Sequence, residues 1–202
     1  MKKEKRTKTL YTSRKEGMNY TLASKDELTK LVKSNGINSW NELTEFVKGL
    51  PYGRNQNRFD LGLVLTERKG SCSSKHALLK KIADFNNIPN VKLFLGIYKM
   101  NQSNTPKIGN ELEKYSIEFI PEAHCYLEIN ETRLDFTADQ SEFEKIQNEI
   151  IEEKEIETGQ VAEFKVEYHK NHIKKWLIET NSEFNFDQFW NVREKCIENL
   201  TE

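Results

Sequence analysis

Cys72 is the residue of this chain whose surroundings best fit a reactive nucleophile. It lies in the run Gly70-Ser71-Cys72-Ser73-Ser74, in which Ser71 is a typical N-cap residue, so the pattern places Cys72 in the first turn of a helix. The free amides and the dipole at a helix N-terminus favour an anion, which lowers the pKa of a thiol and populates the nucleophilic thiolate. The alternative interpretation is a small buried cysteine that only fills space in the core.

A predicted β-hairpin would bring a base and an orienting carboxylate together. We expect strands at residues 123–130 and 132–137, joined by a turn at Asn130-Glu131, with side chains that alternate between the two faces. With a turn of even length, His124 is diagonal to Asp135, a separation that a histidine and a carboxylate can bridge. The polar face takes His124, Tyr126, Glu128, Arg133 and Asp135, and the apolar face takes Cys125, Leu127, Ile129, Leu134 and Phe136.

A cysteine at a helix start, a histidine and an aspartate together supply the parts for nucleophilic acyl transfer. His124 would take the proton of the Cys72 thiol and later protonate the leaving amine, while Asp135 would fix the tautomer of the ring and stabilise the imidazolium. We expect Arg133 and Glu128 to form a cross-strand ion pair at the rim. The residues therefore predict an enzyme that acts on an amide through an acyl-thioester, by hydrolysis or by transamidation.

The oxyanion formed in such a reaction needs hydrogen-bond donors. The backbone amide of Cys72 would supply one, and Tyr52, Asn55 and Gln56 in the loop after Pro51 are candidates for a side-chain donor. Nothing in the spacing selects one of the three, and the alternative is that they are ordinary loop residues.

Helices and strands on both sides of this pattern must hold it in place. Capping-box patterns predict two N-terminal helices that begin after Ser24 and Ser39. Residues 52–69 predict a long loop, and the cysteine-bearing helix should continue to about Phe85. Residues 91–98 then predict a buried strand that precedes the hairpin.

The last third of the chain, from Gln140 onward, has a helical pattern, and its acidic run at residues 152–155 predicts an exposed helix surface. Helices, then a few antiparallel strands, then helices indicate an α+β fold. With no internal repeat or linker, we expect a basic N-terminal extension at residues 1–20 and a single domain at 21–202. Its core would lie at about 60–140 and its C-terminal helical part at about 141–202.

These residues also resemble a known family. The decapeptide Gly-Ser-Cys-Ser-Ser-Lys-His-Ala-Leu-Leu, the strand at 91–98, and the runs His-Cys-Tyr-Leu-Glu and Leu-Asp-Phe-Thr are similar, in order and spacing, to the transglutaminase-like superfamily. The similarity covers roughly residues 60–140, about two-fifths of the chain. It implies a core like that of papain-like cysteine proteases, in which a cysteine-bearing helix packs on a small antiparallel sheet that carries the histidine and the aspartate. Known activities in the family are peptide-bond hydrolysis, transamidation and deglycosylation at asparagine.

By this resemblance Cys72 matches the nucleophile, His124 the base and Asp135 the third member of a catalytic triad. The family often has tryptophan two residues after the histidine, where this chain has Tyr126, which we keep as a further candidate for contact with the substrate. An aromatic residue is also common shortly after the cysteine, where this chain has serines.

Other interpretations use some of the same residues. A zinc site would need ligands from Cys72, His76, His124 and Cys125. Adjacent strand residues point to opposite faces and the chain has no Cys-x-x-Cys, so we expect no metal and no cofactor, and His76 would lie on the helix surface or behind the site. A non-catalytic binding domain on the same scaffold is the alternative function, and an open or a plugged cleft at Cys72 would discriminate the two.

A second group of histidines lies in the C-terminal part. His169 and His172 are three residues apart among lysines that include Lys165, a pattern typical of a solvated basic face. An anion site or a partner site there is the alternative.

The composition excludes several classes of protein. The 202 residues include 31 Lys+Arg and 32 Asp+Glu, and the net charge of -1 gives no global argument for nucleic-acid binding. Three cysteines are an odd number and too few for a disulfide framework, and no apolar run is long enough to span a membrane. The basic start has no apolar segment of a secretory signal behind it. We expect a cytoplasmic protein that has a peptide or amide substrate and binds no nucleic acid or membrane, and the sequence leaves the oligomeric state open.

Overall fold

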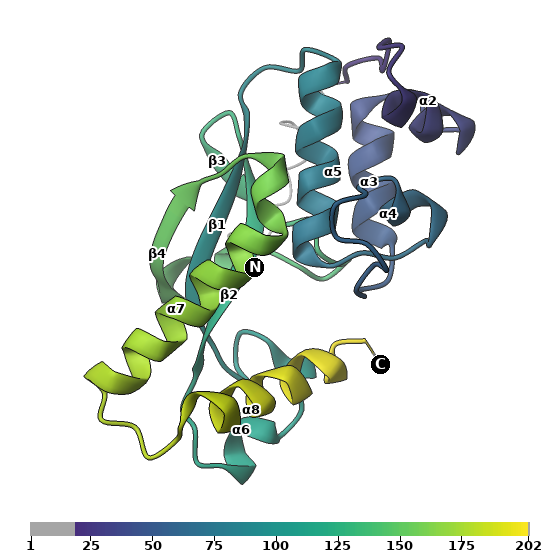
Figure 1. Ribbon diagram of the computed structural model, residues 1–202. Coiled ribbons are helices and arrows are strands. Elements are labelled where there is room, and N and C mark those ends of the chain that lie inside the picture. The colour runs from purple at the N-terminus through teal and green to yellow at the C-terminus, as the bar shows by residue number, and fades with distance from the viewer. Residues whose placement is uncertain (1–18, 202) are drawn as a thin grey trace, which may run out of the picture.

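The chain folds as helices around one antiparallel sheet, and the computed structural model describes residues 19–201 (Figure 1). The helices are α2 (Glu27–Ser34), α3 (Trp40–Gly49), α4 (Leu63–Thr66), α5 (Cys72–Phe85), α6 (Glu111–Lys114), α7 (Glu163–Glu179) and α8 (Phe186–Asn199). The strands are β1 (Val91–Met100), β2 (Ile120–Ile129), β3 (Thr132–Leu134) and β4 (Ile150–Glu155). Short 3₁₀ turns are η1 (Pro106–Ile108), η2 (Phe143–Lys145), η3 (Gln147–Glu149) and η4 (Thr158–Val161).

The predicted α+β class is confirmed by the four-stranded sheet, whose order is β3-β2-β1-β4 and whose neighbours are all antiparallel. β1 and β2 are its long central strands and pair over ten residues each, from Val91 opposite Ile129 to Met100 opposite Ile120. β3 is short, so at the level of His124 the edge of β2 that faces away from β1 has no strand of the described residues beside it. The sheet is therefore open there to the segment that carries Asp135.

The predicted hairpin register is confirmed. Leu127 pairs with Leu134 and Ile129 with Thr132. The turn residues Asn130 and Glu131 both have positive φ, 48° and 64°, which is the backbone of a tight two-residue hairpin turn. The second strand is shorter than predicted, because β3 ends at Leu134 and the chain bends away where the side chain of Asp135 turns toward His124.

Polar caps set the starts of the helices that were predicted from capping boxes, with one correction. Ser39 caps α3 together with Glu42, as predicted. The first helix begins later than predicted, because Asp26 and not Ser24 is its N-cap: the Asp26 carboxylate accepts from the Thr29 amide at 2.8 Å. A carboxylate in that position satisfies a free amide and also complements the helix dipole.

The acidic run at residues 152–155 was predicted as a helix surface, and this prediction is wrong. These residues form β4, an exposed edge strand that pairs with β1 so that Gly96 lies opposite Glu153. Charged side chains are typical of edge strands because they discourage pairing with other chains, and here the hydrogen bonds to β1 outweigh the helical preference of Glu and Lys. The remainder of the predicted C-terminal helical part is mostly helical, in α7 and α8.

The hydrophobic core has two parts that meet at the sheet. One lies between the sheet and α2, α3 and α5, and the other lies among β1, β2, α8 and the second half of α7 (Figure 1). α5 is the central helix and contacts β1, β2 and α3. Its first turn therefore lies where both parts of the core and the open edge of β2 come together.

The N-terminal boundary differs slightly from the predicted one. Residues 1–18 of the predicted extension lie outside the described residues, but Tyr20 belongs to the fold, since its carbonyl accepts from the Trp40 amide at 2.8 Å. Within residues 19–201, none of the helices combines the length and the apolar composition that crossing a membrane requires.

Candidate active site

Cys72 is the first residue of α5, as predicted. Ser71 is the N-cap, and its hydroxyl accepts from the amide of Ser74, whose own hydroxyl accepts from the Ser71 amide at 3.0 Å. Gly70 precedes this cap in a position where a Cβ would approach the side chain of Lys75 to 2.8 Å, so only glycine fits. Cys72 is 6% exposed, and it lines two cavities.

The predicted contact between His124 and Asp135 is confirmed. His124 Nε2 lies 2.9 Å from Asp135 Oδ2. The other carboxylate oxygen, Oδ1, accepts from the amide of Thr137 at 2.9 Å and from its hydroxyl at 2.5 Å. Burial would raise the pKa of Asp135, but His124 and these hydrogen bonds hold it well below its usual range. Asp135 is thus a permanent anion that orients the ring.

Lys165 is the site residue that the sequence analysis missed. Its Nζ lies 3.4 Å from Cys72 Sγ and 2.7 Å from the Ser73 hydroxyl. It had been assigned to a solvated basic face, and this was wrong: α7 packs across β2 and directs Lys165 toward the start of α5. No local signal could have shown this, because 93 residues separate Lys165 from Cys72.

Electrostatics around Cys72 favour the thiolate. Burial alone would raise the pKa of the Cys72 thiol, but the Lys165 ammonium and the His124 ring, which also hydrogen-bonds the sulfur, lower it to about 5. Burial opposes the charged form of His124 as well, yet Asp135 and the Cys72 thiolate raise its pKa to about 10. Between those values the pair exists as thiolate and imidazolium. The same thiolate outweighs burial at Lys165 and raises its pKa above the ordinary value.

His76 was predicted on the helix surface or behind the site, and the structure places it in the interior, fully buried. Its Nδ1 lies 2.7 Å from the Cys72 carbonyl, and its Nε2 accepts from the amide of Phe136 at 2.8 Å. Because Nε2 is an acceptor, the ring is neutral, and burial accordingly lowers the pKa of His76 to about 4. His76 ties the start of α5 to the backbone next to Asp135.

Lys75 reinforces the same connection. Its ammonium is completely buried and donates to the carbonyls of Leu50 and Thr137, the latter at 2.6 Å. These bonds join α5 to the end of α3 and to the segment after Asp135. Burial lowers the pKa of Lys75 to about 8 despite the nearby carboxylates.

The structure distinguishes among the four residues that were candidates for stabilising the oxyanion or contacting the substrate. Tyr52 lines both cavities at Cys72, and burial together with the thiolate raises its pKa, so it is a phenol that can donate. The Asn55 amide group already donates to Leu63, Glu67 and Lys69. Gln56 is exposed and lines neither cavity.

Tyr126 also lies outside both cavities. Its hydroxyl donates to Glu153 at 2.5 Å, while its ring stacks on that of His124 with centroids 6.1 Å apart. Of the four candidates, Tyr52 is the one that lines both cavities at Cys72. The predicted ion pair between Arg133 and Glu128 is confirmed, and Arg133 also pairs with Glu153.

A buried ion pair anchors α8 next to the site. Glu122, two residues before His124 on β2, accepts from Arg193 Nε at 2.8 Å and also pairs with its Nη2. Burial would raise the pKa of Glu122, but the charge of Arg193 outweighs this effect and lowers the pKa to about 2. His169, predicted on a solvated face, is instead buried and donates to the Pro121 carbonyl at 2.8 Å; burial lowers its pKa to about 4.

The other two cysteines have different surroundings from Cys72. Cys125 faces the core on the α5 side, as predicted, and burial raises its pKa to about 11. Cys196 is buried in α8, and its pKa is also raised to about 11 by burial. Among residues 19–201, no group of three or more His, Cys, Asp or Glu side chains is arranged to hold a metal ion.

Comparison of the chain with protein-family models, with curated proteins and with solved structures finds no match.

Proposed function

We propose that this protein is a thiol enzyme that transfers an acyl group from an amide to Cys72, with His124 and Asp135 as the other members of a catalytic triad. The resemblance to the transglutaminase-like superfamily belongs to the same proposal. The observation that supports it most is the sulfur at the start of α5 with a histidine–aspartate pair on one side and an ammonium on the other. A cysteine that only filled the core would need none of these groups.

The residues suit each step of the reaction. The Cys72 thiolate attacks the carbonyl carbon, and the oxyanion that forms is stabilised by the Cys72 amide, with Lys165 and the Tyr52 phenol as further donors. His124 gives its proton to the leaving nitrogen as the carbon–nitrogen bond breaks, which leaves an acyl-thioester and a neutral imidazole. His124 then takes a proton from water or from an acceptor amine, whose attack breaks the carbon–sulfur bond and restores the thiolate.

A binding domain without catalysis on the same scaffold is the second candidate. A plugged cleft at Cys72 would favour it. Instead, two cavities reach Cys72, of about 100 and 590 Å³, and the second is also lined by His124 and Asp135. Cavities that reach the thiolate support catalysis over binding alone.

The decisive experiment is the pH dependence of iodoacetamide labelling at Cys72, read by mass spectrometry of the digested protein. We expect a midpoint near the pKa of about 5 for Cys72. His124→Ala and Lys165→Met should each move it upward, since each removes a cation beside the sulfur, and Lys165→Arg should restore much of the shift.

Cys125 supplies an internal control in the same digest, since burial raises its pKa to about 11 and it should label only at high pH. A Cys72 midpoint near the ordinary thiol value of about 8.5, unmoved by either substitution, would contradict the proposed mechanism.

A further inference from the structure

The two cavities at Cys72 lie on chemically different sides of the sulfur. The larger one, of about 590 Å³, is lined by His124 and Asp135. The smaller one, of about 100 Å³, is lined by Lys165, Arg58 and the first turn of α5, and not by His124. Cys72, Tyr52 and Glu122 form the wall between them, since these residues line both.

The role of His124 in the proposed function decides which part of a substrate each cavity receives. The leaving nitrogen must lie within hydrogen-bond reach of the ring that protonates it, so the leaving group extends into the larger cavity. The acyl group then lies on the other side of the sulfur, in the smaller cavity. At roughly 10–15 Å³ for each water-sized group, that cavity has room for about seven to ten non-hydrogen atoms, which is a short chain.

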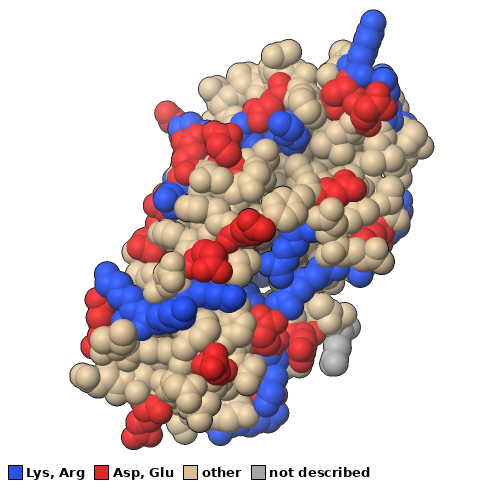
Figure 2. All heavy atoms as spheres, in the orientation of Figure 1, with Lys and Arg blue, Asp and Glu red and all other residues tan. Residues whose placement is uncertain are grey.

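The charges that line the smaller cavity favour an anion. Arg54, Arg58, Lys165 and Arg193 outnumber the two carboxylates, Glu122 and Glu194. Figure 2 shows Lys and Arg side chains gathered beside a hollow in the surface between α7, α8 and the loop that contains α4. His169, which also lines this cavity, is neutral because burial lowers its pKa to about 4.

Two of these cations are already neutralised. Arg193 pairs with Glu122 and Glu194, and Arg54 pairs with Glu194 at 2.8 Å. Arg58 is exposed at the mouth of the cavity and has no ion pair with any of the residues 19–201. Lys165, deeper in the cavity, has the Cys72 thiolate as its nearest anion.

Acylation changes this balance. When the thiolate becomes a thioester its negative charge disappears, and the partly buried ammonium of Lys165 loses its nearest anion. Glu122 remains near but already accepts two hydrogen bonds from Arg193. A carboxylate on the acyl chain would replace the lost charge and lie between Lys165 and Arg58.

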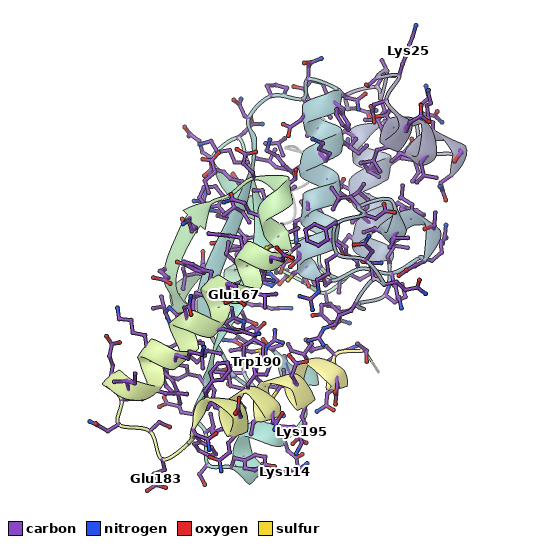
Figure 3. The ribbon with its side chains drawn as sticks, in the orientation of Figure 1. Lys25, Lys114, Glu167, Glu183, Trp190 and Lys195 are labelled. Carbon is purple, nitrogen blue, oxygen red and sulfur yellow. The ribbon has the colours of Figure 1, made fainter. Side chains whose placement is uncertain are left out.

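We propose that the smaller cavity is the acyl subsite for a short acyl chain that ends in a carboxylate. Such a chain is the acyl group of a dicarboxylic monoamide or of a glutamyl residue, whose side chain carries the carboxylate. This assignment rests on the proposed function, because the sidedness of the two cavities comes from the role of His124. Trp190 of α8, whose ring centroid lies 5.2 Å from that of His169 on α7, also lines the subsite (Figure 3).

The first test compares two aminocoumarin amides of equal size, one with a glutaryl group and one with its neutral carboxamide counterpart. We expect kcat/KM to be at least about tenfold higher for the glutaryl amide, as one charge-assisted hydrogen bond supplies. Arg58→Gln should reduce that ratio severalfold. Lys25→Gln removes the same charge at an exposed position far from the site and should leave the ratio unchanged (Figure 3). Equal rates for the two amides in the unaltered protein would overturn the subsite.

A second measurement separates failure of the subsite from failure of the proposed function. The monoamide of glutaric acid and the neutral diamide are compared as protectors of Cys72 against iodoacetamide, which requires no turnover. We expect protection by the monoamide at a concentration at least about tenfold lower. Equal protection alongside a low thiol pKa overturns the acyl subsite alone. An ordinary thiol pKa without turnover of either amide overturns the proposed function, and the acyl assignment with it.

Discussion

His124 and His76 both lie beside Asp135, with ring centroids 6.3 Å apart, but His124 is charged and His76 is neutral. Both rings approach the same carboxylate, His124 at 2.9 Å and His76 at 3.5 Å. Yet the pKa of His124 is raised to about 10, while burial lowers that of His76 to about 4.

The second partner of each ring explains the difference. His124 faces the Cys72 thiolate, so it has an anion on both sides. The Nε2 of His76 accepts a hydrogen bond from the Phe136 amide, which requires an unprotonated nitrogen. A shared carboxylate therefore does not decide the charge of a buried histidine; the other groups that contact its ring nitrogens do. One ring is suited to proton transfer and the other to holding the backbone.

The largest expected effect comes from Asp135→Asn, which removes the shared charge without changing size. Thr137 donates to Oδ1 through both its amide and its hydroxyl, so the new amide oxygen must occupy that place. The amide nitrogen would then donate to His124 Nε2 and force the wrong tautomer. We expect kcat/KM on an acyl-coumarin amide to fall by roughly 10³–10⁴-fold, as in triads that lose this carboxylate.

The matched control is Asp84→Asn, the same change in the last turn of α5, where the carboxylate pairs with Lys80 on the surface. It should leave the rate unchanged. A loss of less than about tenfold in Asp135→Asn would show that the carboxylate does not select the tautomer, and would remove the basis for treating the two histidines differently.

The sequence alone predicts the positions of these residues but not the charges of the two histidines. The start of α5 and the faces of the hairpin follow from local rules, a capping serine and a period of two, and these rules alone predict where Cys72, His124 and Asp135 lie. The charge of His76 depends on an amide 60 residues away. Lys165 depends on how α7 crosses the sheet.

The misassignment of β4 has the same origin. Its Glu and Lys residues carry no alternation of apolar and polar side chains, because an exposed edge strand buries neither face. Pairing with β1, which lies about 55 residues earlier in the chain, makes it a strand. In this molecule, local patterns predicted the positions of Cys72, His124 and Asp135, and tertiary packing supplied the groups that set their charges.

The next largest effect is expected from His76→Ala, which should lower the stability of the fold. It leaves the buried Phe136 amide without an acceptor and opens a cavity beside α5, which together cost about 2–4 kcal/mol of unfolding free energy. Urea denaturation measures the loss. The pH midpoint of Cys72 labelling should stay low, in contrast to His124→Ala, since His76 is neutral. A large upward shift of that midpoint in His76→Ala would mean that His76 shares the catalytic charge.

The smallest expected effect is on the pH dependence of stability. The folded-state pKa of His76 and of His169 is lowered to about 4, below the unfolded value of about 6.5, so each group stabilises the fold above about pH 6.5 and loses that contribution as the pH falls toward 4. Cys72 acts in the same direction, because it is a thiolate in the folded protein down to its pKa of about 5 and a thiol in the unfolded chain. His124 does not oppose these groups below about pH 6.5. Because its pKa is raised to about 10, its contribution to the stability of the fold is lost only as the pH rises from about 6.5 toward 10. Unfolding near pH 5.5 should thus take up about two to three protons, a slope of about 3–4 kcal/mol per pH unit.

His76→Leu and, independently, His169→Phe should each lower that uptake by about one proton, or about 1.4 kcal/mol per pH unit. Urea unfolding curves recorded at several pH values between about 5 and 7 give the slope for each protein. If the wild type and both variants showed the same slope, the two rings would be protonated in the folded state, and the contrast between His76 and His124 would be lost. A reduced slope in both variants would show that burial keeps these two histidines neutral in the folded protein.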